Sequence, residues 1–312
     1  MTALHSRVDG AGPTIVLLHA GVADSRMWDP QVAALSRGHT VVRCDLRGFG
    51  RSALSPGVVS CDAEDVLGLL DELEVGRFSL VGASYGGQVA LQVASTVPDR
   101  VERLVLLAPA ADLVEPDASL QSLWVKEGRL VDAGDLDAAT ELNVDAWLGP
   151  EADDDARASV RRMQREALAQ QVAAGDVESR DLPIHLDRLV MPTVVFVGAH
   201  DFEFFRTIAQ ELVARLSSAR LVELPWAGHL PTVERPEEGT RLLLDALGDT
   251  DHGDGPAPRD QDQGQDQDHP PSRDGLTDAQ VWEWVGDHWR IRTITATEEP
   301  NRGGSPAPVE EP

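Results

Sequence analysis

The 312-residue chain is predicted to fold as a doubly wound α/β domain around a mostly parallel sheet. Short Val- and Leu-rich runs, each of strand length, occupy residues 14–19, 40–45, 78–82, 101–108, 193–198 and 220–225. Helix-periodic segments separate several of them, at residues 61–74, 86–97, 206–216 and 236–247. Continuous apolar strands that alternate with helices are typical of a parallel sheet covered on both faces.

Residues 112–190 interrupt this alternation. Apolar residues recur at helical spacing in "LQSLWVKEGRLVDAG", in "DLDAATELNVDAWLG" and again around Val160 and Met163. We therefore expect a helical cap, inserted after the strand that ends near Ala108, above the carboxyl edge of the sheet, where open α/β sheets bind ligands. The expected division is a core of residues 1–111 and 191–248 with a cap of residues 112–190.

Residues 249–312 have a different composition, dominated by Asp, Gly, Pro and Gln. Such a segment cannot bury enough apolar surface to fold alone, so we expect an acidic, mostly disordered tail. Within it, alternation around Gly286 and Asp287 predicts a Trp-rich hairpin at residues 280–296. Because a lone hairpin is marginally stable, it would dock on the body, on a second copy or on a partner.

The formal net charge of −26 argues against nucleic acid or an anionic membrane as a partner, since both need a basic surface. The first residues, "MTALHSRVDGAGP", lack the basic and apolar regions of a signal peptide, and the apolar runs are too short to cross a bilayer. We expect a cytoplasmic protein. Its two cysteines, Cys44 and Cys61, cannot form a disulfide framework.

A serine between glycines follows the strand at residues 78–82 in "LVGASYGGQVAL". The pattern G-x-S-x-G between a strand and a helix is the nucleophile-elbow signature, in which a sharp turn exposes the serine hydroxyl. We therefore predict Ser84 as a nucleophile. Two backbone N–H groups should hold an oxyanion: Tyr85, directly after the serine, and Gly21 in the loop after the first strand, with Val22 as the alternative.

A serine nucleophile needs a base. His229 follows the last body strand at the same sheet edge and is the first candidate; His200 and His185 are weaker ones. His19, at the end of a strand, is expected to support the adjacent loop by hydrogen bonds.

Asp201 follows the preceding strand and would orient His229, so that the chain order is Ser, Asp, His as in nucleophile-elbow folds. Glu203 and Asp112 are alternatives to Asp201. Glu234 is expected to be structural.

Five motifs stand in an order that resembles the α/β-hydrolase superfamily: "LLHAGVADSRMWDPQ", "VVRCDLRGFGRS", "LVGASYGGQVALQVASTVPDRVERLVLLAP", "VVFVGAHD" and "AGHLPTVERPEE". The similar branch contains carboxylesterases, 3-oxoadipate enol-lactonases, cofactor-free haloperoxidases and C–C bond hydrolases. The resemblance implies Ser84 as nucleophile, His229 as base and acid, Asp201 as orienting carboxylate and residues 112–190 as the lid. In three features the chain departs from the family: Ala20 stands between His19 and Gly21, the first of two antiparallel strands is expected to be missing, and the tail is additional.

The predicted function is a serine hydrolase that cleaves a carboxylic ester or lactone through an acyl-enzyme, with no metal or organic cofactor. Alternatives are perhydrolase or haloperoxidase-like chemistry or C–C bond hydrolysis at the same residues, and a non-catalytic protein that binds through its tail. The expected partner is a small-molecule substrate; homo-oligomers or a tail-mediated partner are further possibilities.

Overall fold

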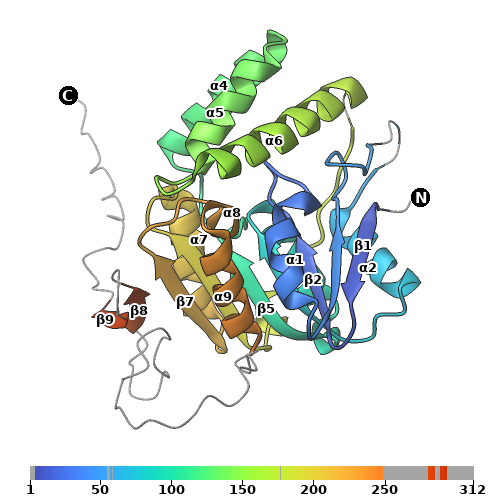
Figure 1. Ribbon diagram of the computed structural model, residues 1–312, viewed down its shortest axis with the longest axis vertical. Helices are drawn as coiled ribbons and strands as arrows, with labels where there is room; N and C mark the ends of the chain where they lie inside the picture. The colour runs from blue at the N-terminus through green and yellow to red at the C-terminus, as the bar shows by residue number, and fades with distance from the viewer. Residues whose placement is uncertain are drawn as a thin grey trace, which may run out of the picture.

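The strands form one sheet in the order β1-β3-β2-β4-β5-β6-β7-β8-β9 (Figure 1). The computed structural model describes residues 4–54, 57, 59–175 and 177–248, together with the backbone of 280–284 and 289–293. The core strands are β1 (Ser6–Gly10), β2 (Thr14–Leu18), β3 (Thr40–Cys44), β4 (Phe78–Ala83), β5 (Val101–Leu107), β6 (Thr193–Gly198) and β7 (Ala219–Leu224). All six predicted strands are present, and β2 to β7 pair in parallel.

One strand was not predicted. β1 pairs antiparallel with β3, with Val8 opposite Val42. Its side chains are exposed or half-buried, so the segment lacks the apolar run that identified the other strands. Within the described residues, one antiparallel strand thus precedes β2 in the chain.

Helices cover both faces of the sheet, as the alternation predicted. The helices outside the cap are α1 (Asp29–Leu35), α2 (Asp62–Glu72), α3 (Tyr85–Thr96), α7 (Glu203–Arg215), α8 (Pro231–Glu234) and α9 (Pro236–Leu247), with short 3-10 turns η1 (Ser25–Trp28) and η2 (Pro98–Arg100). A third 3-10 turn, η3 (Leu186–Arg188), falls near the end of residues 112–190. Side chains alternate along β2: Ile15 and Leu17 join one buried cluster with α1 and α9, while Val16 and Leu18 join a second with α2 and α3.

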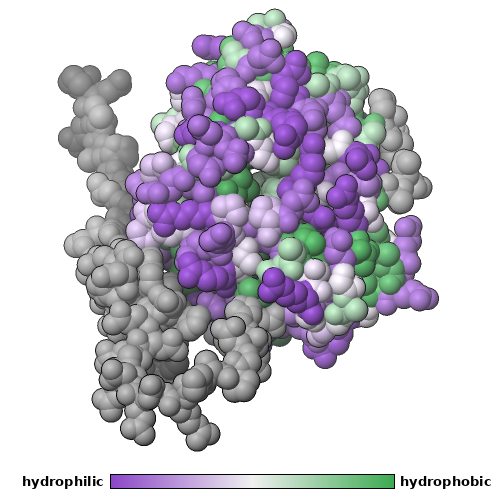
Figure 2. Space-filling model, viewed as in Figure 1, coloured by the Kyte–Doolittle hydropathy of each residue, from purple (hydrophilic) through white to green (hydrophobic). Residues whose placement is uncertain are grey.

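Three helices lie between β5 and β6, in the segment where the sequence predicts the cap. They are α4 (Ala118–Asp132), α5 (Leu136–Trp147) and α6 (Asp154–Ala174). Each begins after an aspartate whose side chain accepts backbone N–H bonds of the first turn: Asp117, Asp135 and Asp153. Figure 1 shows the three helices together at one end of the sheet, and hydrophilic residues predominate over them in Figure 2. We keep the name cap for residues 112–190; its status as a separate domain stays a prediction.

The predicted hairpin contains two strands, β8 (Gln280–Trp284) and β9 (Trp289–Thr293), which pair antiparallel. β8 also pairs in parallel with β7, through Val222 with Trp282 and Glu223 with Glu283. The turn and the rest of residues 249–312, including the segments expected to be disordered, lie outside the described residues. No helix in the described part of the chain is long and apolar enough to span a membrane.

Candidate active site

Ser84 lies at the junction of β4 and α3 with a strained backbone. Its φ of 51° and ψ of −116° fall in a region that non-glycine residues avoid, at a cost of about 1–3 kcal/mol. The flanking glycines allow the turn: a Cβ on Gly82 would collide with the carbonyl oxygen of Gly86, and one on Gly86 with the carbonyl oxygen of His19. The spacing of glycines in the motif is therefore a steric requirement of this turn.

Backbone hydrogen bonds hold the strained residue in place. The Ser84 N–H donates to the carbonyl oxygen of Leu107 on β5 at 2.9 Å, and the Ser84 carbonyl accepts from Gly87 at 2.8 Å and Ala110 at 3.0 Å. These bonds leave the hydroxyl of Ser84 free to face the space between sheet and cap, where Ser84 lines a cavity.

His229 lies in the loop between β7 and α8, and its Nδ1 is 2.8 Å from Oδ2 of Asp201. Both side chains are buried, with 3% and 0% of their surface exposed. The other Asp201 oxygen accepts a hydrogen bond from the Phe202 backbone at 2.7 Å. Because Asp201 can only accept when ionised, the neutral imidazole carries its proton on Nδ1 and leaves Nε2 as the acceptor.

Aromatic residues from two elements enclose the imidazole of His229. The ring centroids of Trp147 at the end of α5 and of Phe205 on α7 lie 4.6 Å and 4.3 Å from that of His229. The His229 N–H also donates to the Trp147 carbonyl at 3.1 Å. The cap thus helps to position His229. Sequence reasoning missed this role of Trp147, because its helical spacing indicated only a core residue.

Glu234 holds the backbone on both sides of His229. Its carboxylate accepts from the Gly228 N–H at 2.8 Å and the Leu230 N–H at 3.0 Å, and the Gly149 amide at the end of the cap helix α5 also donates to it. Only 3% of Glu234 is exposed, and this burial raises the pKa of its carboxyl. The structural role expected for Glu234 is therefore to join the His229 loop to the cap.

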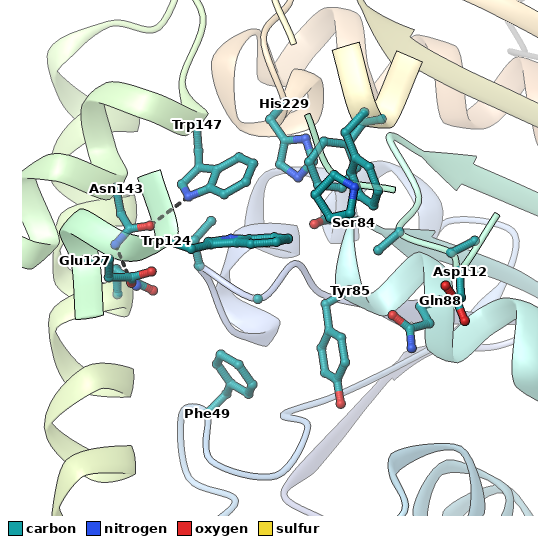
Figure 3. A pocket seen from close by; sticks show the side chains of 18 of the residues that line it. Phe49, Ser84, Tyr85, Gln88, Asp112, Trp124, Glu127, Asn143, Trp147 and His229 are labelled. Carbon is teal, nitrogen blue, oxygen red and sulfur yellow. Dashed lines mark hydrogen bonds between the residues drawn. The ribbon is translucent and has the colours of Figure 1, made fainter. Parts of the chain in front are cut away.

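A cavity of about 510 Å³ opens between the cap and the sheet (Figure 3). Ser84 and His229 both line it, and Figure 3 shows their side chains next to each other. Gly21, Val22 and Tyr85 line it too, and a Cβ on Gly21 would lie 3.5 Å from Cβ of Tyr85. The structure thus brings together Ser84, His229 and all the candidate oxyanion residues. Asp201 lies behind His229.

Tyr85 is also fixed through its side chain, since its hydroxyl donates to Oδ2 of Asp62 at 2.5 Å. Burial and the nearby Asp62 carboxylate raise the pKa of the Tyr85 phenol, which keeps it protonated as the donor. This bond anchors the residue whose amide is the candidate oxyanion donor.

The alternative residues lie elsewhere or have other partners. Asp112 lines the cavity but makes no hydrogen bond to His229, and Glu203 pairs with Arg206 at 3.3 Å. His200 and His185 are exposed, and neither lines the cavity.

His19 has the supporting role expected for it. Its Nε2 accepts from the Leu46 N–H at 2.9 Å, and its Nδ1 lies 2.9 Å from the Ala20 carbonyl oxygen. Burial lowers the pKa of this imidazole, so it is neutral and donates through Nδ1.

Among the described residues no group of His, Cys, Asp and Glu has the arrangement of a metal site.

Known proteins resemble this chain in both sequence and structure. A pimeloyl-[acyl-carrier protein] methyl ester esterase of Nitrosomonas europaea is 30% identical over 76% of this chain and 97% of its own length. A protein of Variovorax paradoxus named as a carbamate hydrolase is 33% identical over 78% of this chain and 96% of its own. The crystal structure of an enol-lactonase from Burkholderia xenovorans LB400 superimposes with a TM-score of 0.65 and 31% identity, covering 78% of this chain and 96% of that one.

These relatives are hydrolases, and the match covers nearly the whole length of each of them. Residues 15–241, which include Ser84, Asp201 and His229, match the Alpha/beta hydrolase family. The chain belongs to the α/β-hydrolase family.

Proposed function

We propose that the protein is a serine hydrolase that cleaves a carboxylic ester or lactone through an acyl-enzyme. Ser84 is the nucleophile, His229 the general base and acid, and Asp201 the carboxylate that orients His229. The backbone amides of Gly21 and Tyr85 hold the oxyanion. One observation carries the proposal: a strained serine faces the same cavity as a buried histidine whose Nδ1 is bonded to a buried aspartate.

In the first half of the proposed reaction, Nε2 of His229 takes the proton of the Ser84 hydroxyl as the oxygen attacks the substrate carbonyl. The negative charge that develops on the carbonyl oxygen lies at the N-terminus of α3, where the Tyr85 N–H and the helix dipole stabilise it. The imidazolium then donates its proton to the leaving alkoxide as the C–O bond breaks.

In the second half, His229 takes a proton from water, and the resulting hydroxide attacks the acyl-enzyme carbonyl. The acid leaves as the proton returns to Ser84. Asp201 stabilises the imidazolium in both halves without itself becoming protonated.

The names of the relatives support acyl chemistry: one is named for a methyl ester, one for an enol-lactone and one for a carbamate. In each of these compounds a nucleophile attacks a carbonyl carbon that is bonded to a further oxygen. We therefore take ester or lactone hydrolysis as the first activity to assay.

A fluorophosphonate probe tests the proposed nucleophile, because it phosphonylates only an activated serine. We expect stoichiometric labelling of the wild type, no labelling of Ser84→Ala and unchanged labelling of Ser95→Ala, a buried serine further along α3. Failure of the wild-type protein to react would contradict the proposal. Peroxide-dependent halogenation that exceeds ester turnover would instead favour perhydrolase chemistry at Ser84.

A further inference from the structure

The charged residues that line the cavity have one sign. Apart from His229 they are Asp112, Glu115 and Glu127, and neither Arg nor Lys is among the lining residues of the described chain. A substrate with a carboxylate would find no cation to pair with inside this cavity. A substrate with a positive charge would be attracted to it.

These three carboxylates lack the ion pairs that neutralise acidic residues elsewhere on the cap. The paired ones include Asp137 with Arg165, Asp145 with Arg157 and Glu141 with Arg161. Within the described part of the chain, no ion pair reaches Asp112, Glu115 or Glu127. The negative charge at the cavity is therefore available to a ligand.

Glu127 is the cavity carboxylate that the protein holds in position. It accepts a hydrogen bond from Nδ2 of Asn143 at 2.7 Å, and Oδ1 of Asn143 accepts from the Trp147 indole at 2.7 Å. Trp124 lies three residues before Glu127 on α4, so both side chains project from the same face of the helix. In Figure 3 the Trp124 ring lies between Glu127 and Ser84. An indole face beside a carboxylate is suited to a cation.

Gln164 on α6 lines the cavity and carries a buried, unsatisfied hydrogen-bond acceptor. Only 4% of the residue is exposed, and its Oε1 has no hydrogen-bond partner among the described residues. A buried acceptor without a donor is unfavourable, so a rotation of the side-chain amide that brought Oε1 to a ligand N–H would gain a hydrogen bond. This observation is independent of the acidic residues and also calls for a donor on the ligand.

We propose that the cavity selects esters that carry a protonated amine on their acyl or alcohol part. The ammonium group donates to the Glu127 carboxylate and lies against the face of Trp124, and the Gln164 amide accepts a further N–H once it turns its oxygen to the cavity. Asp112 and Glu115 at the cavity add to the negative field. The inference rests on the proposed ester hydrolysis and names its substrate class.

Three ethyl esters of equal chain length test the charge preference: ethyl 6-aminohexanoate, ethyl heptanoate and monoethyl heptanedioate. They carry a cation, no charge and an anion at the same distance from the carbonyl. At pH 7.5 and low salt we expect kcat/KM about tenfold higher for the amino ester than for ethyl heptanoate, and about tenfold lower for the anionic ester. An anionic ester hydrolysed as fast as the neutral one would overturn the proposal.

Two matched variants test whether Glu127 causes the preference for the amino ester. Glu127→Gln removes the charge but keeps an oxygen that accepts from Asn143, so the ratio of the amino ester to the neutral ester should fall severalfold. Glu141→Gln removes a cap carboxylate that pairs with Arg161 and should leave the ratio as in the wild type. If the ratio of the amino ester to the neutral ester were the same in Glu127→Gln as in the wild type, the assignment of the amine site to Glu127 and Trp124 would be overturned.

Binding separates this inference from the proposed function. Titration of Ser84→Ala with ethyl 6-aminohexanoate and with ethyl heptanoate, followed by tryptophan fluorescence, measures affinity without turnover. Tighter binding of the amino ester that is lost in Ser84→Ala/Glu127→Gln supports the amine site even if no ester is hydrolysed. Turnover of all three esters at equal rates would retain the serine hydrolase and reject the amine site.

Discussion

The turn that carries Ser84 and the loop that carries His229 are held by different means. The turn at Ser84 is made possible by its immediate neighbours in the chain, because a side chain at Gly82 or Gly86 would collide with nearby backbone. His229 is placed mainly by residues from other segments of the chain, with Asp201 on its ring and Trp147 on its backbone. Glu234, five residues further along, holds the flanking amides. A local motif therefore identifies Ser84, whereas the exact position of the His229 ring depends on tertiary contacts.

The largest expected effect comes from removing the contact that orients His229. Asp201→Asn leaves a side chain of the same shape but offers an N–H in place of a carboxylate oxygen, which favours the wrong tautomer. We expect kcat for ester hydrolysis to fall by roughly 10³–10⁴-fold with little change in thermal stability.

Glu203→Gln is the matched control for Asp201→Asn, because Glu203 lies two residues away and pairs with Arg206. It should remain within about twofold of the wild type, as surface ion pairs contribute little. If the two variants lost activity equally, Asp201 would not be the orienting carboxylate.

Glu234→Gln tests whether the His229 loop needs the carboxylate that accepts from its flanking amides. One of the two side-chain oxygens becomes an NH₂ group that cannot accept from Gly228 or Leu230, so the loop should shift. We expect kcat to fall by roughly 10- to 100-fold at nearly constant KM, because a small misplacement of a reacting group is costly. A change in KM alone would indicate that Glu234 acts on the cap and not on His229.

Ser84→Gly measures the strain stored at the turn. Glycine adopts positive φ without cost, and this gain exceeds the extra entropy that glycine loses on folding. We expect the free energy of unfolding to rise by about 1 kcal/mol relative to Ser84→Ala, which keeps the Cβ and therefore the strain. Urea denaturation of both inactive variants gives the difference, and equal stabilities would argue that the turn is unstrained.

The smallest expected effect is a pH dependence of stability that arises from Glu234. Burial raises the pKa of its carboxyl above the ordinary value of 4.5, so the folded state binds this proton more tightly than the unfolded state does. The contribution of Glu234 is therefore most favourable below 4.5 and falls as the pH rises through the folded-state pKa. As the pH rises above 4.5, the stability of the wild type should decline more, or rise less, than that of Glu234→Gln. If the stabilities of the wild type and of Glu234→Gln changed with pH in the same way, Glu234 would not contribute to the pH dependence.

Several features of this protein follow from its sequence alone. Apolar runs of strand length and helical periodicity predict the parallel sheet and the helices that cover it, because they report which faces must be buried. The turn at Ser84 is also local, since glycine spacing specifies it. Asp201 and His229 can be proposed from their positions after neighbouring strands, as parallel strands end at one edge of the sheet.

Tertiary structure decides how the cap completes the cavity. The amphipathic spacing around Trp124 and Trp147 shows that they belong to helices, but not which of them meets His229 and which faces the cavity. That outcome depends on how α4, α5 and α6 pack over the sheet. The same packing leaves Glu127 without an arginine while Glu141 on the next helix has one. The charge of the cavity is thus a property of the packed helices, because charges interact through space and not along the chain.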